Sequence, residues 1–181
     1  MKFKIGKKTI SEDRMYVVAE ISANHGGSIS RAKKLISFAK KAGVDAVKIQ
    51  SYSPDSMTIN SNKKDFQIEH FKWKKYKNFY KLYQKGQTPN KWIKELFLYA
   101  KKIKIDIFSS PFDEKAVDEL EKCGCIAYKI ASPEINHIPL LKKVAKTQKP
   151  IIISTGVANI KDIELAIDII KKNGNKKIIL L

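Results

Sequence analysis

Short apolar runs of strand length alternate along the chain with longer segments in which apolar residues recur at helical spacing. The strand-like runs lie, in order, at residues 15–22, 46–52, 105–111, 126–132, 150–156 and 176–181. The segments with a helical period lie at residues 30–43, 69–86, 90–104, 113–124, 138–148 and 159–174. This alternation predicts βαβ units and a parallel sheet. The strands are nearly continuous Val/Ile runs, which indicates that both faces of the sheet are covered.

The predicted strands share a polar carboxyl end. The residues concerned are Glu20 and Ser22, Lys48 and Gln50, Ser109 and Ser110, Lys129 and Ser132, and Ser154 and Thr155. This pattern is typical of TIM (β/α)8 barrels, in which the chemistry lies at the carboxyl ends of several strands. We therefore expect an α/β fold in which residues 1–181 form the N-terminal portion of a TIM barrel, with about six strands and five helices. The alternative is an open doubly wound sheet, although no G-x-G-x-x-G motif follows the first strand.

Two of the predicted strands contain a lysine, which is rarely buried without a partner. Lys48 shares one strand face with Ala46 and Gln50, and Lys129 shares one with two alanines, because strand side chains alternate between faces. In a barrel that face is the interior. Two ammonium groups there would repel each other, and the single carboxylate of Glu20 cannot neutralise both. The pattern favours an anionic substrate, although a Schiff-base lysine is the rival interpretation.

The segment after the first strand, EISANHGGS at residues 20–28, supplies further candidates. Its two glycines allow tight turns close to a ligand. His25 could polarise a substrate oxygen or orient Glu20, although a loop histidine held by hydrogen bonds is the simpler interpretation. The chain's three histidines are scattered and form no H-E-x-x-H motif, so the sequence indicates no self-contained metal site.

The net charge of +18 raises the question of a polyanionic partner. Only two of the 36 basic residues are arginines, and the lysines are spread over the helical segments without a dense patch. Nucleic-acid sites favour arginine, so we expect a solvated lysine-rich surface and no nucleic-acid partner, with a basic polyanion-binding protein as the alternative. Cys123 and Cys125 match neither a zinc site nor a disulfide framework. No signal peptide or membrane segment is recognisable, so we expect a cytoplasmic protein.

Several longer motifs carry a resemblance to a known family. They are AEISANHGGS, DAVKIQSYSPDSMT, LYQKGQTPNKW, FSSPFDEKAVDELE and AYKIASPEINHIPLLKKVAKTQKPIIISTG. In collinear order over nearly the whole chain, they resemble the sialic acid (N-acetylneuraminate) synthase family, which condenses phosphoenolpyruvate with an N-acylated sugar. The segments SANHGGS, IQSYSPDSMT and TPNKW look most like the pseudaminic acid synthase branch. N-acetylneuraminate and legionaminate synthases are the neighbouring alternatives.

The resemblance implies a set of site residues. Phosphoenolpyruvate would be held by the residues that match the family's binding positions, Lys48, Ser110, Lys129, Ser132 and Ser154. Glu20 would assist proton transfer, and Asn24, His25 and Gln50 would line the sugar side. The family reaction uses a divalent metal, Mn²⁺ or Mg²⁺, to polarise the aldehyde of an open-chain N-acetylated amino sugar. The product is a nine-carbon 2-keto acid for cell-surface glycans.

The resemblance also implies parts that these 181 residues do not contain. The family's metal ligands, its remaining barrel strands and its C-terminal antifreeze-like domain are expected beyond residue 181. We expect this polypeptide alone to be inactive and its first and last sheet strands to be open edges. The whole protein of this family is expected to be a homodimer.

Overall fold

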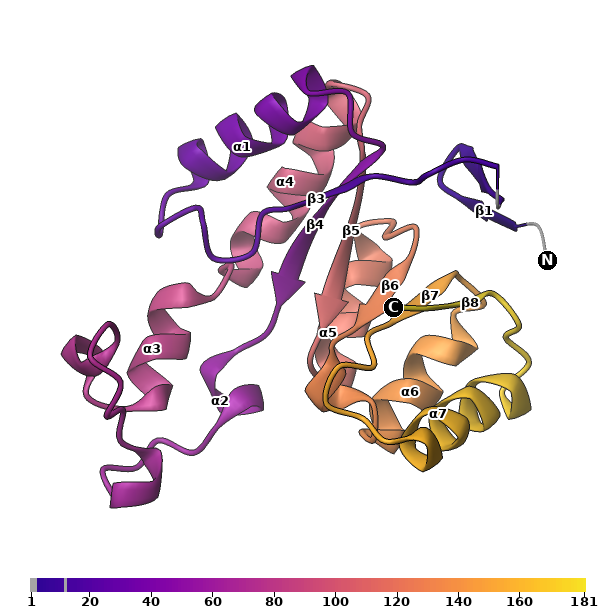
Figure 1. Cartoon of the computed structure of the whole chain (residues 1–181). Helices are drawn as coiled ribbons and strands as arrows, with labels where there is room; N and C mark the ends of the chain where they lie inside the picture. Colours follow the sequence, from indigo (N-terminus) through magenta and orange to yellow (C-terminus); the bar gives the residue numbers. More distant parts are fainter. Residues whose placement is uncertain (1–2, 12) are drawn as a thin grey trace.

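The computed structural model describes residues 3–11 and 13–181, and its centre is a curled six-stranded parallel sheet (Figure 1). The strand order is β3-β4-β5-β6-β7-β8, so each strand pairs with its neighbours in the sequence. The strands are β3 (Val18–Glu20), β4 (Ala46–Ser51), β5 (Asp106–Pro111), β6 (Tyr128–Ile130), β7 (Ile151–Ile153) and β8 (Ile178–Leu180). This continuous order excludes the doubly wound alternative, in which the order reverses at a switch point.

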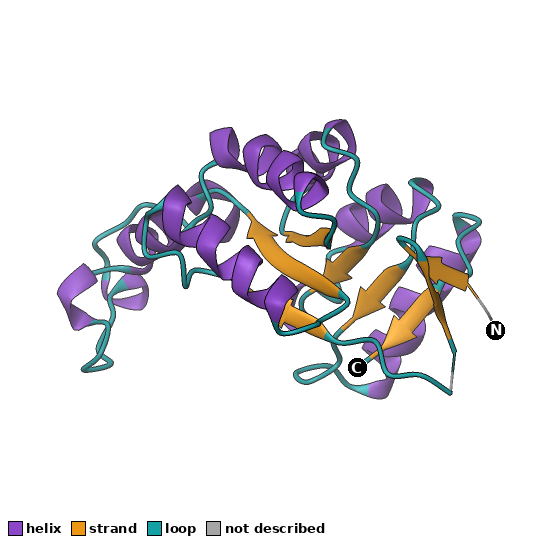
Figure 2. Ribbon diagram, turned by 90° about the horizontal axis from the view of Figure 1, so that it is seen from above, coloured by secondary structure: helices purple, strands orange, loops and turns teal. Residues whose placement is uncertain are grey.

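One long helix connects each strand to the next, and these helices line one side of the curled sheet (Figure 2). They are α1 (Ile29–Lys41), α4 (Asn90–Lys102), α5 (Glu114–Lys122), α6 (Ile138–Lys146) and α7 (Ile160–Lys172). Right-handed crossovers between sequential parallel strands place every helix on the same face. The architecture is therefore a partial TIM barrel of six strands and five connecting helices, as the sequence predicted.

The pleat of the strands separates a helix-facing side from a concave inner side. Val47 and Ile49 of β4 and Ile151 and Ile153 of β7 face the helices, and all four are buried. The residues between them, such as Lys48, therefore point to the inner side. The apolar core between the sheet and its helices is thus built from the helix-facing residues, and the inner side carries the strand lysines next to their register partners Phe108 and Ile152.

The sequence did not predict the hairpin at the amino end of the sheet. It consists of β1 (Phe3–Ile5) and β2 (Lys8–Ile10), two strands too short to show a period of two. Gly6 turns the chain with φ +57°, and a Cβ on it would lie 2.0 Å from the Asp106 carboxylate. Lys8 and Arg14 both pair with the buried Asp45 just before β4. The hairpin is thereby fixed against the amino ends of β4 and β5.

The prediction of a helix at residues 69–86 is wrong for the first half of this range, since the helix begins only at Phe79. The segment from Tyr52 to Pro89 instead holds three short pieces and one helix: α2 (Pro54–Met57), two 3₁₀ turns (Lys64–Phe66 and Lys74–Tyr76) and α3 (Phe79–Gly86). Asn78 ends the irregular part, because its side chain accepts a hydrogen bond from the Lys81 backbone N–H and so caps α3. This excursion extends from the carboxyl end of β4, away from the sheet (Figure 1).

The sheet strands are shorter than the apolar runs suggested. The run at 126–132 becomes a three-residue strand followed by a 3₁₀ turn at Ser132–Glu134. Pro133 cannot donate a backbone hydrogen bond to a neighbouring strand, so pairing stops there. The run at 15–22 likewise keeps only Val18–Glu20 as strand. Ser22 and Ser132 therefore lie in the loops at the carboxyl edge, whereas Glu20 and Lys129 stay within the strands.

Candidate active site

Lys48 lies on the inner side of the sheet, between a carboxylate and a hydroxyl from its two neighbouring strands. Glu20 is its register partner on β3, and Lys48 Nζ forms an ion pair with Glu20 Oε2. Lys48 Nζ also donates a hydrogen bond of 3.3 Å to Ser110 Oγ on β5. The Lys48 side chain is only 13% exposed and that of Glu20 is 43% exposed. The lysine is thus held in place while its carboxylate partner remains open to solvent.

Lys129 on β6 is the second strand lysine, and it is close enough to Lys48 for their charges to interact. Burial lowers the pKa of Lys129, and the Lys48 ammonium lowers it further. Glu20 and Glu134 act in the opposite direction on the same pKa. Over residues 3–11 and 13–181, Lys129 has no ion-pair partner of its own. The two ammonium groups therefore converge, and one of them lacks a direct counter-charge.

The three predicted serines lie at successive strand ends. Ser110 is fully buried beneath Lys48 Nζ. Ser132 Oγ accepts a hydrogen bond of 2.8 Å from the backbone N–H of Val157, which ties the loop after β7 to the loop after β6. The backbone N–H of Ser154 donates to the Ile130 carbonyl oxygen, and its half-buried hydroxyl forms no hydrogen bond with the described residues. Ser132 and Ser154 therefore have hydroxyl hydrogens available to an anion.

Glu134 is a site residue that the sequence interpretation missed. It ends the 3₁₀ turn after β6, and its Oε2 atom is buried without a partner in the part of the chain that the structure describes. Burial raises the pKa of this carboxyl, while its own backbone N–H, Lys129 and His137 lower it. The sequence contained one pointer, the S-P-E triplet directly after a strand that carries a lysine. Glu134 thus gives the site a second carboxyl group beside Lys129.

Ser22 connects two of the other predicted residues. Its backbone N–H donates to Glu20 Oε1 at 2.9 Å, and its hydroxyl donates to Gln50 Oε1 at 2.7 Å. Ser22 adopts a φ of +44°, which brings its backbone and side chain into reach of both. Gln50 therefore lies at the edge of the lysine site, whereas Asn24 is exposed on the following turn.

His25 lies apart from these groups, in a buried position. Its Nδ1 accepts a hydrogen bond of 3.0 Å from the Gly27 backbone, and its ring meets Trp92 of α4 edge-on at 5.5 Å. Burial lowers the pKa of His25, so its imidazole is neutral at pH 7 and Nε2 carries the proton. Nε2 has no partner among the described residues. At 1% exposure the ring is part of the turn after β3, and among the described residues no hydrogen bond joins it to Glu20.

A comparison with protein-family models shows which family has this arrangement of residues. The model described as the NeuB family matches residues 35–181, which include both strand lysines, Glu134 and the three serines. The chain belongs to the NeuB family. The sialic acid synthase resemblance drawn from the motifs is thereby confirmed.

Named relatives of this NeuB-family chain agree with the assignment. It is 45% identical over 165 residues to a pseudaminic acid synthase of Helicobacter pylori, covering 91% of this chain and 48% of that protein. It is 40% identical over 162 residues to an N,N'-diacetyllegionaminic acid synthase of Campylobacter jejuni, covering 89% and 48%. The chain therefore spans about half the length of these curated relatives.

A solved structure supports the fold of the NeuB-family chain. A sialic acid synthetase from Leptospira borgpetersenii, crystallised with citrate, superposes with a TM-score of 0.83 at 27% identity. The match covers 99% of this chain and 58% of that one. The partial TIM barrel is therefore the arrangement that a protein of the same class adopts over the corresponding region.

The described residues of the NeuB-family chain do not form a metal site. Within them no group of three or more His, Cys, Asp or Glu side chains could hold a metal ion. Cys125 is instead a buried thiol that donates to the Ala127 carbonyl oxygen, and burial raises its pKa to about 12. The described helices include none that is long and apolar enough to span a membrane. That Mn²⁺ or Mg²⁺ ligands lie beyond residue 181 stays a prediction.

Proposed function

We propose that this chain supplies the phosphoenolpyruvate-binding part of a pseudaminic-acid-synthase-type enzyme. Such an enzyme would condense phosphoenolpyruvate with an open-chain N-acetylated 6-deoxy amino sugar, giving a nine-carbon 2-keto acid and phosphate. One observation carries the proposal: Lys48 and Lys129 converge at the carboxyl ends of the strands with one direct counter-charge between them. Phosphoenolpyruvate brings a phosphate and a carboxylate, so it can neutralise the remaining positive charge.

The proposed anion pocket combines charge with directed hydroxyl groups. Lys48 and Lys129 provide the two ammonium groups, and Ser110, Ser132 and Ser154 provide hydroxyl groups at the carboxyl ends of β5, β6 and β7. Hydrogen bonds between charged partners are about twice as strong as neutral ones. The sheet fixes the spacing of the two lysines and Ser110 before the ligand arrives, so little ordering of these groups is needed on binding.

The two carboxyl groups have environments suited to opposite proton transfers. In the proposed reaction, C3 of phosphoenolpyruvate forms a bond to the aldehyde carbon of the sugar, and the aldehyde oxygen takes up a proton. Water adds to C2 and gives up a proton. The C2–O bond to phosphate then breaks, and the C2 hydroxyl loses its proton to leave the ketone. Glu20, which faces Lys48 as a carboxylate, suits the base role, and the raised pKa of Glu134 suits proton donation.

The acceptor is the least constrained part of the proposal. The identity to the pseudaminic acid synthase exceeds that to the diacetyllegionaminic acid synthase by a small margin, 45% against 40%. We infer the pseudaminic acid branch from this margin together with the motif resemblance. A legionaminate- or neuraminate-type acceptor is the alternative, and sugar competition in the complete enzyme would separate the three.

Calorimetric titration with phosphoenolpyruvate tests the pocket directly. We expect saturable binding to the described chain and a loss of at least about tenfold in affinity for Lys129→Ala, since a charge-assisted contact of about 1.4 kcal/mol is removed. Lys142→Ala on the exposed face of α6 is the matched control, because it removes the same charge away from the site. Equal losses in the two variants, or no binding by a cooperatively folded chain, would contradict the proposal.

One observation also favours a Schiff-base aldolase as the second candidate. A lysine whose pKa is lowered by burial is a better amine nucleophile, and Lys129 fits this description. Borohydride reduction in the presence of pyruvate would then attach the keto acid to Lys129 irreversibly, and mass spectrometry of the digested chain would locate it. Absence of the adduct in a chain that binds phosphoenolpyruvate leaves the synthase-type pocket as the sole candidate.

A further inference from the structure

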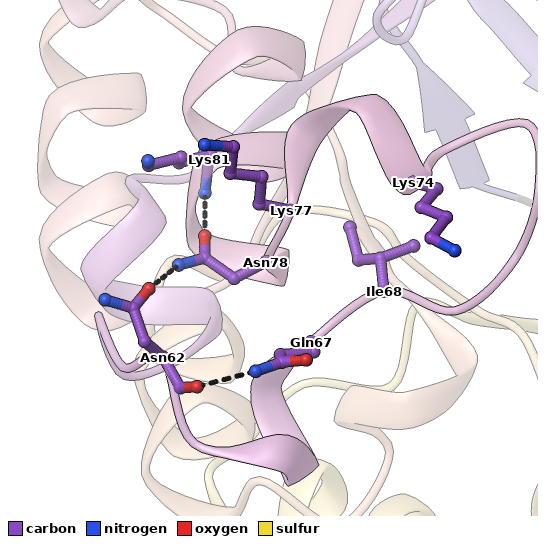
Figure 3. Close-up of a pocket in the computed structure, with 7 residues that line it drawn as sticks. All are labelled: Asn62, Gln67, Ile68, Lys74, Lys77, Asn78 and Lys81. Carbon is purple, nitrogen blue, oxygen red and sulfur yellow. Dashed lines mark hydrogen bonds between the residues drawn. The ribbon is translucent and has the colours of Figure 1, made fainter.

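A second cationic site lies in the excursion between β4 and α4, within residues 62–81. It is a cavity of about 490 Å³, a volume typical of small-molecule sites. Its lining includes three lysines and three side-chain amides, Lys74, Lys77, Lys81, Asn62, Gln67 and Asn78 (Figure 3). One isoleucine completes it, and none of the described lining residues is acidic. The lining therefore offers hydrogen-bond donors and positive charge.

The cavity walls are held in place without the lysine side chains. Buried Asn78 donates from Nδ2 to Asn62 Oδ1 at 3.1 Å, and Gln67 Nε2 donates to the Asn62 carbonyl oxygen at 2.8 Å (Figure 3). The Ile68 backbone N–H donates to the Lys77 carbonyl oxygen at 3.0 Å, which closes the loop on itself. The walls are thus preorganised by amide contacts.

The three ammonium groups remain available to a ligand. Within residues 3–11 and 13–181, none of Lys74, Lys77 and Lys81 forms an ion pair. All three residues are exposed, so each ammonium group is hydrated and not satisfied by the protein. Three positive charges around one cavity, with no acidic lining residue among them, match a multiply charged small anion better than they match a neutral sugar.

The backbone at Lys77 is strained where it borders the cavity. Lys77 has φ +65° and ψ −53°, and the Asn78 N–H donates to the Tyr76 carbonyl oxygen at 2.8 Å across it. This is a γ-turn with positive φ, which is rare and unfavourable for a residue with a side chain. Strained backbone of this kind is found disproportionately at ligand sites. A glycine would fit this turn without strain, yet the position carries one of the three cavity lysines.

We propose that this cavity binds a small phosphate-bearing anion, such as a phosphate or diphosphate ester. A phosphate group accepts from several ammonium donors at once, and the lysines supply point charges without the planar geometry of arginine. This site is formed by residues of the excursion alone and shares none with the strand-end pocket of Lys48 and Lys129. The inference therefore does not depend on the proposed synthase function.

Titration with sodium pyrophosphate, followed by ¹H–¹⁵N NMR, tests the site with a local readout. The Lys129→Ala chain is used so that the strand-end pocket contributes little. We expect saturable shifts of the side-chain amide signals of Asn62, Gln67 and Asn78. Saturation without movement of these three signals would overturn the proposal, and so would the absence of saturable binding.

Two triple variants of equal charge separate a specific site from general attraction. Changing Lys74, Lys77 and Lys81 together to Gln should weaken pyrophosphate binding by at least about tenfold. The control changes Lys63, Lys64 and Lys85 to Gln, three exposed lysines of the same excursion that do not line the cavity. The control should stay within about twofold of the parent chain. Equal weakening in both would identify non-specific attraction and overturn the proposal.

A single substitution covers the case in which the triple variant does not fold. Lys77→Gly relieves the strained γ-turn and removes one ammonium group, so Tm should rise while pyrophosphate affinity falls. Unchanged affinity in this variant would count against the site. A 20-base-pair DNA duplex is the final comparison: binding of the duplex without binding of pyrophosphate would make the excursion a nucleic-acid contact and overturn the small-anion proposal.

Discussion

The molecule uses lysine in two contrasting ways, at the strand ends and in the excursion after β4. At the strand ends, Lys48 and Lys129 project from β4 and β6, are half-buried, and interact with carboxyl groups. In the excursion, Lys74, Lys77 and Lys81 lie on turns and on the first turn of a short helix, and all are exposed. Sheet positions thus fix the site by burial, whereas the excursion positions its site by a local hydrogen-bond network.

The two lysine sites depend on the rest of the fold to different degrees. A strand-end lysine is positioned by neighbours far away in the sequence, since Lys48 meets Ser110 across 62 residues. The excursion cavity is built within a single stretch of about 20 residues. We therefore expect substitutions in the core to abolish the strand-end pocket before the excursion cavity. Substitutions within the excursion should abolish its cavity and spare the strand-end pocket.

The largest expected effect comes from the core beneath the strands. Ile153→Ala, at a residue with 0% exposure, should lower the free energy of unfolding by about 2–5 kcal/mol. Phe71→Ala, at 78% exposure in the excursion, should change it by less than about 0.5 kcal/mol. Urea denaturation measures both. Similar costs would mean that the excursion is packed as tightly as the sheet.

The pH dependence of phosphoenolpyruvate binding should report the lowered pKa of Lys129. The affinity for phosphoenolpyruvate should fall by about tenfold as pH rises through the pKa of Lys129. Because this pKa is lowered, the fall should occur below pH 10.5, the ordinary pKa of lysine. Calorimetry between neutral pH and pH 10.5 measures the fall, and Lys129→Arg should delay it because arginine stays charged. Over the same pH window Lys129 holds its proton more often in the unfolded chain than in the folded chain. The unfavourable contribution of Lys129 to the free energy of unfolding therefore becomes smaller as pH rises.

Asn78→Ala should affect the excursion alone. The substitution removes the cap of α3 and the bond to Asn62, at a cost of about 1 kcal/mol. Amide hydrogen exchange should quicken within residues 62–86, and pyrophosphate binding should weaken while phosphoenolpyruvate binding is retained. Equal loss of both ligands would show that the two sites are coupled.

Glu20→Gln should change stability little and ligand binding in the opposite direction to Lys129→Ala. The Glu20–Lys48 pair is partly open to solvent, so its loss should cost no more than about 1 kcal/mol. Phosphoenolpyruvate should nevertheless bind more tightly, because the variant removes the negative charge that competes with the ligand for Lys48. Thermal unfolding and calorimetry measure the two quantities. Weaker binding would indicate that Glu20 positions Lys48 for the anion.

Much of the fold was predictable because its information is periodic. Parallel strands covered on both faces read as apolar runs, and helices read as 3.6-residue repeats, so the order of the barrel units followed from the sequence. The β1–β2 hairpin was not predictable in this way, because two three-residue strands around Gly6 carry no period. The start of α3 was missed because the aromatic and lysine spacing at 69–78 imitates a helix, while the cap at Asn78 decides where the helix begins.

The candidate site was predictable where a residue broke the pattern of its strand. Lys48 and Lys129 are charged residues within apolar runs, so they were found from alternation alone. Glu134 lies in a turn, where polar residues are ordinary, and only its burial beside Lys129 distinguishes it. His25 is a different case, because the sequence left open a site role and a loop histidine held by hydrogen bonds. Its buried ring accepts a hydrogen bond from the Gly27 backbone and packs against Trp92.

The hairpin held by Asp45 also bears on how such a barrel can diverge in evolution. Lys8, Arg14 and the Val17 backbone all converge on this one carboxylate, and Gly6 leaves no space for a side chain beside Asp106. Insertions at the amino end would have to disrupt these contacts, whereas the carboxyl end already accommodates the whole excursion of residues 52–89 without altering the sheet register. Sequence drift among relatives should therefore concentrate on the carboxyl side, so that new ligand preferences can arise there while the opposite end stays constant.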